Sequence, residues 1–131
     1  MSDKMNRQRR PVKLLLVDDE EGFVDVMSKR MARRNIQVTK ALSGTEGIRA
    51  LRHQDYDVAV IDLKMEDMDG IEVLTILKKM TPDMPVIMLT GHGSEQAARE
   101  GIRIGASDYL TKPCELETLI RKIREVTGSA G

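Results

Sequence analysis

Five side chains that could do chemistry follow short apolar runs of the sequence. They are the carboxylates of Asp18, Asp19 and Asp62, the hydroxyl of Thr90 and the amine of Lys112. Carboxylates held close together repel one another, so positive charge has to offset them. A hard divalent cation such as Mg²⁺ prefers oxygen ligands and often shares them with a phosphate group. If the fold brings these groups together, they indicate a Mg²⁺-dependent site for a phosphoryl group, with Lys112 as a second cation.

The apolar runs before these residues are typical of strands buried on both faces of a parallel sheet. Residues 12–17, 58–61 and 86–89 are short and almost continuously aliphatic. Residues 37–41 and 107–111 fit two further strands. Five helices are predicted between and after them by apolar residues at helical spacing: Phe23, Val26, Met27 and Met31; Ile48 and Leu51; Ile71, Leu74 and Leu77; Ala98 and Ile102; Leu116, Leu119, Ile120 and Ile123.

Local signals mark where two of these helices begin or end. Asn35 tolerates the left-handed backbone that follows a helix, so the first helix is expected to end near it. Ser43-Gly44-Thr45-Glu46 has the pattern of a capping box, in which the serine and glutamate side chains bond to backbone N–H groups at the start of a helix.

A strand followed by a helix, five times over, predicts an α/β fold with a parallel sheet covered on both faces. In such open sheets, ligands bind beyond the carboxyl ends of the strands. Four of the five predicted strands end in the groups named above, which therefore converge on one edge. Taken singly, each has an ordinary explanation, because adjacent acids often cap a helix and a lysine is often solvated surface. Their occurrence together at four strand ends favours a functional site.

Composition excludes several other classes of protein. The 131 residues fit one domain, and 21 basic residues balance 21 acidic ones, so binding to nucleic acid through bulk charge is not expected. The single cysteine, Cys114, excludes an internal disulfide framework and a CxxC metal site, and we expect it to pack instead of reacting. No apolar run has the length of a membrane span and the chain does not begin with a signal-peptide core, so a cytoplasmic location is expected.

Four segments resemble the receiver domain of bacterial two-component response regulators. They are LLLVDDE (14–20), IDLKMEDMDG (61–70), VIMLTGHGS (86–94) and GASDYLTKP (105–113). The resemblance covers residues 12–127 and implies a flavodoxin-like, CheY-like (βα)5 fold, which is a doubly wound five-stranded parallel sheet with strand order 2-1-3-4-5. Residues 1–11 are then expected to form a flexible basic tail, and residues 128–131 a disordered end.

The resemblance implies a role for each residue of the site. Asp62 is the expected phospho-acceptor. Asp18 and Asp19 are the acidic pair expected to hold Mg²⁺, with Asp19 the direct ligand and the backbone carbonyl of Lys64 a further one. Lys112 is expected to pair with the phosphoryl oxygens and to precede a proline through a bond that is often cis.

Two further pairs of residues are implied to shape the response. Thr90 resembles the switch hydroxyl that moves toward the phosphoryl group, and Tyr109 the switch aromatic that then turns inward. The side chains of Lys64 and His92 stand two positions after Asp62 and Thr90, where family members tune the lifetime of the phosphoryl group. We therefore expect Lys64 and His92 to set a slow-to-moderate lifetime.

The loop after Asp62 departs from the family pattern. Glu66 stands where proline is common, and Asp67 stands where glycine or asparagine is frequent. The loop is therefore more acidic than usual, and we expect altered rigidity and stronger attraction for the metal. Unchanged Mg²⁺ affinity and phosphorylation rate in Glu66→Pro would contradict this.

The implied function is a signalling switch that accepts a phosphoryl group and is not a turnover enzyme. A Mg²⁺-dependent phosphohydrolase on a similar fold is one alternative. Such enzymes typically carry a second acid two positions after the first, and Asp62-Leu63-Lys64 places a lysine there. A degenerate receiver that acts only as a protein-binding scaffold is the other alternative.

The resemblance also implies partners. The donor would be a sensor histidine kinase or a histidine phosphotransfer protein, docking near the basic residues Lys29, Arg30, Arg33 and Arg34 of the first helix. No nucleic-acid or membrane partner is expected for the chain. Phosphorylation-dependent homodimers are compatible with the family. A stand-alone receiver and a receiver excised from a longer regulator, with an output protein or output domain still to be identified, both fit the sequence.

Overall fold

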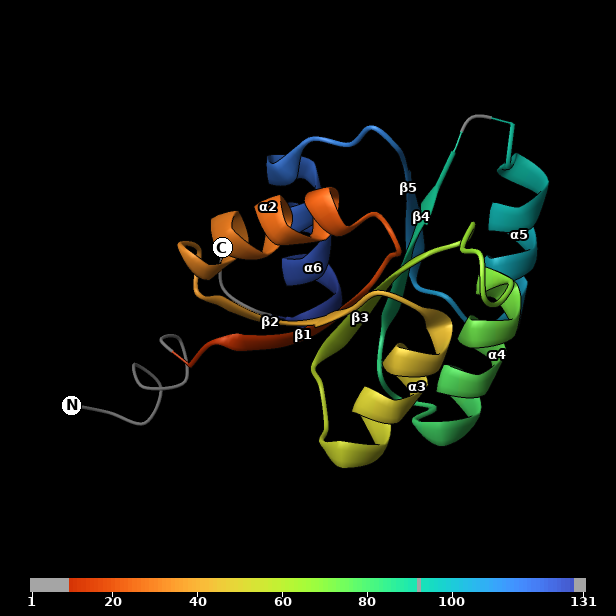
Figure 1. The fold of residues 1–131 in the computed structure, drawn as a ribbon, viewed down its shortest axis with the longest axis horizontal. Helices are drawn as coiled ribbons and strands as arrows, with labels where there is room; N and C mark the ends of the chain where they lie inside the picture. Colours follow the sequence, from red (N-terminus) through yellow and green to blue (C-terminus); the bar gives the residue numbers. More distant parts are fainter. Residues whose placement is uncertain (1–9, 92, 129–131) are drawn as a thin grey trace.

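Helices cover both faces of a five-stranded parallel sheet in the computed structural model, which describes residues 10–91 and 93–128 (Figure 1). The strands are β1 (Val12–Val17), β2 (Ile36–Ala41), β3 (Val58–Asp62), β4 (Val86–Thr90) and β5 (Asp108–Thr111). The helices are α2 (Glu21–Ala32), α3 (Gly44–His53), α4 (Gly70–Met80), α5 (Glu95–Ile104) and α6 (Leu116–Thr127). Neighbouring strands are parallel in the order β2-β1-β3-β4-β5, so the expected fold and strand order are confirmed.

Alternate residues of the central strands supply two separate apolar layers. Leu14 and Leu16 of β1 face the layer shared with α2 and α6, whereas Leu15 and Val17 face the layer shared with α3, α4 and α5 (Figure 1). All four side chains are fully buried. Because both faces of β1 are covered, its sequence is a continuous apolar run instead of an alternating one.

Two of the apolar residues whose spacing predicted the helices are exposed. Val26 is 47% exposed and Ile102 is 41% exposed. In α2 the inward stripe includes Val24 instead, and in α5 it is formed by Ala98 and Gly101. Both helices were predicted correctly, and these two residues lie outside their buried stripes.

Helix boundaries follow the local signals with small differences. The α2 helix ends at Ala32, and Asn35 beyond it has a left-handed backbone with φ 63°. The hydroxyl of Ser43 accepts a hydrogen bond from the N–H of Glu46 at 3.1 Å, as the capping pattern predicts. The Glu46 carboxylate accepts from the N–H of Leu42, one residue earlier than in the standard capping box. Within the described residues, no helix has the length and apolarity that crossing a membrane requires.

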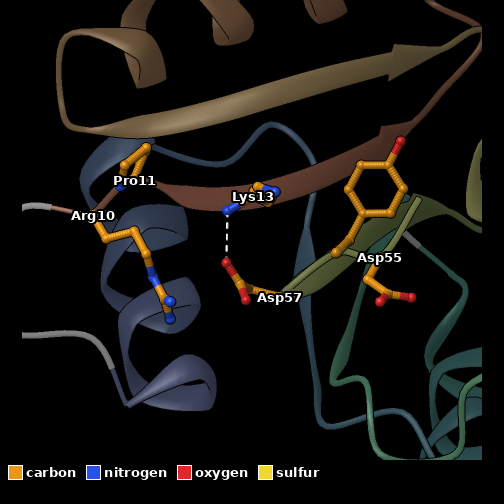
Figure 2. A pocket seen from close by; sticks show the side chains of 6 residues that line it. Arg10, Pro11, Lys13, Asp55 and Asp57 are labelled. Atoms are coloured by element: carbon orange, nitrogen blue, oxygen red, sulfur yellow. Dashed lines mark hydrogen bonds between the residues drawn. The ribbon is translucent and has the colours of Figure 1, made fainter. Parts of the chain in front are cut away.

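The amino-terminal edge of the sheet carries a depression that faces away from the predicted site (Figure 2). It is lined by Arg10, Pro11, Lys13, Asp55, Tyr56 and Asp57. The backbone N–H of Lys13 donates to Asp57 Oδ2 at 2.8 Å and joins the start of β1 to the residue before β3. The chemistry predicted from the sequence belongs to the opposite edge.

Candidate functional site

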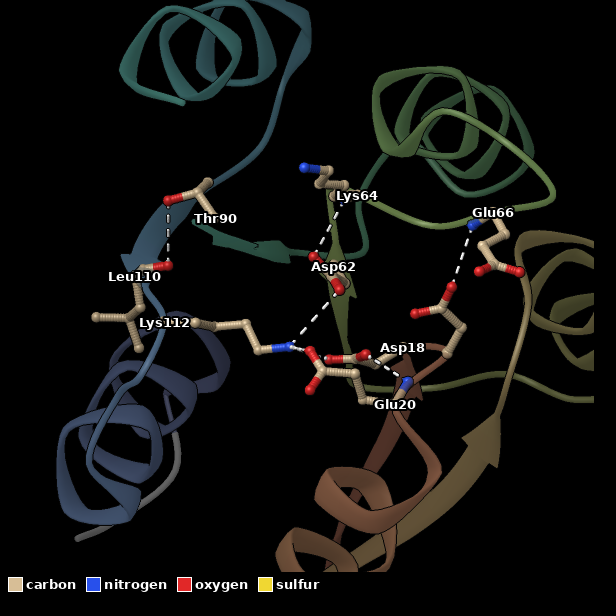
Figure 3. A network of polar contacts seen from close by, with 9 residues as sticks. Asp18, Glu20, Asp62, Lys64, Glu66, Thr90, Leu110 and Lys112 are labelled. Carbon is tan, nitrogen blue, oxygen red and sulfur yellow. Dashed lines mark hydrogen bonds and ion pairs between the residues drawn. The ribbon is translucent and has the colours of Figure 1, made fainter. Parts of the chain in front are cut away.

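The carboxyl-terminal edge of the sheet brings together the groups that the sequence placed there (Figure 3). Asp18 follows β1, Asp62 and Thr90 are the last residues of β3 and β4, and Lys112 follows β5. Asp18, Asp62 and Thr90 are 0%, 5% and 3% exposed, and they are the buried polar residues of the described part of the chain. Because burying a charge is costly unless it is paired, the neighbours of these groups decide what the site can do.

Lys112 is the cation at the centre of the site. Its Nζ lies 2.9 Å from Asp18 Oδ2, 2.6 Å from Glu20 Oε1 and 3.6 Å from Asp62 Oδ2. It also lies 4.5 Å from the centre of the Phe23 ring, within the range of a cation–π contact. Burial by itself would lower the pKa of Lys112, but the hydrogen bonds to Glu20 and Asp18 and the nearby negative charges raise it. The ammonium group is therefore charged at every physiological pH.

The peptide bond after this lysine is cis, as the resemblance implied. The N–H of Lys112 donates to the carbonyl of Thr90 and so joins the residue after β5 to the end of β4.

Asp62 is a carboxylate whose charged form is disfavoured in the resting site. Burial, the largest cause, and the neighbouring charge of Asp18 together raise its pKa from 3.8 to about 6. A hydrogen bond from the N–H of Lys64 to Asp62 Oδ1, at 3.1 Å, and the positive charge of Lys112 oppose this rise. Asp62 is still mostly ionised at neutral pH, and additional positive charge near it would be favourable.

Three carboxylates form a cluster able to hold a cation. Oxygen atoms of Asp18, Glu20 and Asp62 all lie within 4.8 Å of one another. Hard oxygen donors of this kind fit Mg²⁺, which is commonly held by a few carboxylates and completes its coordination with waters and phosphate oxygens. Glu20 was not predicted as a site residue. The acidic run that begins at Asp18 was the only signal for it, because which acid turns inward depends on how the chain enters α2.

Asp19 was expected to be the direct metal ligand, and it is turned toward the loop after β3. Its Oδ2 accepts a hydrogen bond from the backbone N–H of Glu66 at 3.1 Å (Figure 3). The side chain of Lys64 is exposed on the same loop. The ligand roles of Asp19 and of the Lys64 carbonyl stay predictions.

The loop after β3 folds back onto the end of its own strand. The N–H of Gly70 donates to the carbonyl of Leu63 at 3.1 Å, and Lys64 and Asp69 form an antiparallel bridge. A Cβ atom on Gly70 would lie 2.3 Å from the Cα of Leu63, so only glycine fits at this crossing. The loop is therefore closed tightly at its base, next to Asp62.

The predicted switch residues lie on two neighbouring strands. The hydroxyl of Thr90 donates to the carbonyl of Leu110 at the long distance of 3.5 Å, so it is weakly held. Tyr109 is 39% exposed, an outward position from which it would have to turn to reach Thr90. His92, predicted to tune the phosphoryl lifetime, lies outside the described residues.

Comparison with known proteins identifies the family. The family model of the response regulator receiver domain matches residues 14–124. The transcriptional regulatory protein GlrR of Escherichia coli is 38% identical over 114 residues, which make up 87% of this chain and 26% of the relative. The photosynthetic apparatus regulatory protein RegA of Cereibacter sphaeroides is 38% identical over 102 residues, or 78% of this chain and 55% of the relative.

Solved structures agree with the sequence relatives. A receiver domain protein from Clostridium thermocellum superimposes with a TM-score of 0.86 at 34% identity, covering 89% of this chain and 94% of that one. The receiver domain of the Francisella response regulator 1452 gives 0.83 at 33% identity, covering 89% and 97%. The chain spans between about a quarter and about half of the length of the GlrR and RegA relatives. The chain belongs to the receiver domain family of two-component response regulators.

Proposed function

We propose that Asp62 accepts a phosphoryl group from the phosphohistidine of a sensor kinase or of a phosphotransfer protein. The observation that carries this proposal is the placement of Asp62, a buried and mostly ionised carboxylate, within reach of the Lys112 ammonium and beside a second buried acid, Asp18. A buried carboxylate that serves only structure is normally neutralised by close pairing. Here the 3.6 Å contact with Lys112 leaves an oxygen of Asp62 incompletely paired.

The transfer needs one nucleophile and charge neutralisation around it. A carboxylate oxygen of Asp62 forms a bond to phosphorus while the bond from phosphorus to the imidazole nitrogen of the donor breaks, and that nitrogen takes up a proton. Phosphoryl transfer depends mainly on positioning and on offsetting negative charge. Lys112 supplies positive charge beside Asp62, and the N–H of Lys64 fixes the orientation of the carboxylate. The chain would also accept phosphoryl groups from small phosphodonors and lose them slowly to water.

Mg²⁺ is the proposed cofactor. The residues that would hold it are Asp18, Glu20 and Asp62, with Asp19 and the Lys64 carbonyl as further predicted ligands. When bound, Mg²⁺ offsets the negative charge of the transferred group. The carboxylate cluster supports this choice, because its oxygen donors are of the kind that Mg²⁺ prefers.

Phosphorylation would act as a switch through Thr90 and Tyr109. An aspartyl phosphate adds strong acceptor oxygens at Asp62. The hydroxyl of Thr90 would exchange its long bond to Leu110 for one of these oxygens, and Tyr109 would turn inward from its exposed position. The lifetime of the modified state would be tuned by Lys64 and His92.

The proposed donor-docking surface lies on α2. Lys29 and Arg30 are exposed on α2 and Arg33 is exposed directly after its end, whereas Arg34 forms an ion pair with Glu117 of α6. The receiver unit is proposed to span residues 12–127 and to work in the cytoplasm. Its proposed output is a separate protein or a fused output domain, with a phosphorylation-dependent homodimer as a further proposed assembly; GlrR and RegA are named as regulatory proteins.

The test is the intact mass of the chain after incubation with Mg²⁺ and acetyl phosphate. Wild type should gain the mass of one phosphoryl group, and Asp62→Asn should gain none. Turnover of a generic phosphate ester without formation of the adduct would favour the phosphohydrolase instead. A wild-type chain that gains no mass and shows no change with beryllofluoride would favour the scaffold.

A further inference from the structure

The loop of residues 63–69 holds two carboxylates of the site through its backbone. The N–H of Lys64 donates to Asp62 Oδ1, and the N–H of Glu66 donates to Asp19 Oδ2, both at 3.1 Å. A shift of this loop would therefore turn both carboxylates. What holds the loop in place consequently also determines the geometry of the site.

The Asp67 side chain joins this loop to another part of the chain. Asp67 Oδ1 accepts from the N–H of Gly44 at 3.0 Å, and Asp67 Oδ2 accepts from both the N–H and the hydroxyl of Thr45 at 3.1 Å. Gly44 and Thr45 are the first two residues of α3, so Asp67 joins the loop to the start of that helix.

The start of α3 is suited to hold this carboxylate. Ser43 already accepts the N–H of Glu46, which leaves the N–H groups of Gly44 and Thr45 for Asp67. The first turn of a helix favours a negative charge. The hydrogen bond from Gly44, which has the largest effect, and those from Thr45 hold the pKa of Asp67 below its ordinary value. The carboxylate therefore stays charged down to acidic pH.

Packing restricts the contact further. Gly44 is buried, and a Cβ atom placed on it would lie 2.7 Å from the Val73 side chain and 3.1 Å from Met68. The side chain after Asp67 therefore lies directly against the helix start that Asp67 binds. The loop and α3 are therefore in close contact at this point, and the short Asp67 side chain reaches from one to the other.

We propose that Asp67 is a positioning residue for the phosphorylation site. It fastens the loop of residues 63–69 to α3 and so fixes the N–H groups of Lys64 and Glu66 on Asp62 and Asp19. Through them it sets how tightly Mg²⁺ binds. This inference rests on the proposed function, because it concerns the same Mg²⁺ site and the same acceptor. Asp67 itself touches neither the acceptor carboxylate nor Lys112.

The test compares Asp67→Ala with Asp67→Asn, which keeps one acceptor oxygen, and with Asp55→Ala, which removes an exposed acid at the opposite edge of the sheet. Mg²⁺ affinity is measured by calorimetry, and backbone exchange by NMR. We expect Asp67→Ala to bind Mg²⁺ about 3- to 10-fold more weakly and to exchange the N–H of Glu66 about 10-fold faster. Asp67→Asn should fall between Asp67→Ala and wild type, and Asp55→Ala should match wild type.

Phosphorylation by acetyl phosphate separates the positioning role from a general loss of structure. Asp67→Ala should need more Mg²⁺ for its half-maximal rate, while its rate at saturating Mg²⁺ stays within about two-fold of wild type. Mg²⁺ affinity and backbone exchange equal to those of Asp55→Ala would overturn the inference, as would a wild-type chain that binds no Mg²⁺. A wild-type chain that binds Mg²⁺ but accepts no phosphoryl group would refute the proposed function, and the affinity and exchange data would still decide the role of Asp67.

Discussion

Lys112 Nζ and Glu20 Oε1 lie 2.6 Å apart, the shortest of the three contacts between this lysine and the acids around it. Glu20 is thus both a partner of the lysine and a member of the carboxylate cluster. We predict that Glu20→Gln binds Mg²⁺ about 10-fold more weakly, because the cluster loses one of its three negative charges. Calorimetric titration with Mg²⁺ measures this. Unchanged affinity would mean that Glu20 serves only to hold Lys112.

Asp62→Asn should stabilise the chain in a pH-dependent way when no Mg²⁺ is present. The pKa of Asp62 is raised in the folded state from 3.8 to about 6, so the folded chain binds more protons than the unfolded chain between these values, and its stability falls as pH rises through them. The penalty is absent below about pH 4 and complete above about pH 6, where it amounts to about 3 kcal/mol.

Urea unfolding of wild type and Asp62→Asn at pH 4 and pH 7.5, with a chelator, tests this. Asp62→Asn should be more stable by about 3 kcal/mol at pH 7.5 and nearly equal to wild type at pH 4. Asp55→Asn removes an exposed carboxylate and should change little at either pH. A stabilisation of Asp62→Asn that is the same at both values would rule out the raised pKa as its cause.

Lys112→Met should leave the carboxylate cluster without its cation. Because Asp18 is fully buried, we expect a loss of about 2–4 kcal/mol in the free energy of unfolding without metal. Millimolar Mg²⁺ should restore more stability to this variant than to wild type, since ligands that bind the folded state stabilise it. Lys40→Met removes an exposed partner of Asp25 and should cost less than about 1 kcal/mol. Equal losses in the two variants would contradict the central role of Lys112.

Gly70→Ala should destabilise the chain, because its Cβ would lie 2.3 Å from the Cα of Leu63, and a backbone atom cannot move away as a side chain does. We expect a loss of about 1–3 kcal/mol and weaker Mg²⁺ binding from the displaced loop. Gly22→Ala is the matched control, since it lies in α2 with open space around it and should stabilise by about 0.5–1 kcal/mol. Urea unfolding of both variants checks the opposite signs.

Much of the fold could be predicted because the sheet is buried on both faces. The three central strands, β1, β3 and β4, are almost continuous apolar runs, and the ends of all five strands were predicted to within one residue. The inward faces of the helices were harder, and α5 shows why. A Cβ atom on Gly101 would lie 2.1 Å from the sulfur of Met88, so a glycine faces the sheet where a long methionine fills the space. Ile102 is apolar and fits the helical spacing, but its side chain is exposed on the outer face of α5.

The candidate site was predicted where its residues end strands, and missed where they do not. Asp62 and Thr90 end buried strands, so the topology alone placed them together. Glu20 lies three positions after the end of β1, at the N-cap of α2, where the direction of a side chain depends on how the chain enters the helix. Asp67 accepts a hydrogen bond from Gly44, 23 positions earlier in the sequence, and no local sequence pattern predicts a hydrogen bond between residues so far apart.

Cys114 has a practical consequence for experiments on this chain. It is the only cysteine of the sequence, it is half-buried against the apolar layer under α2 and α6, and burial raises its pKa. Thiolates, not thiols, attack labelling reagents, so Cys114 should react slowly at neutral pH. An added cysteine at exposed Asp55, on the edge of the sheet away from the site, should therefore take up a fluorophore selectively while the native thiol stays in place. The side chains of the phosphorylation edge are left untouched by such a label.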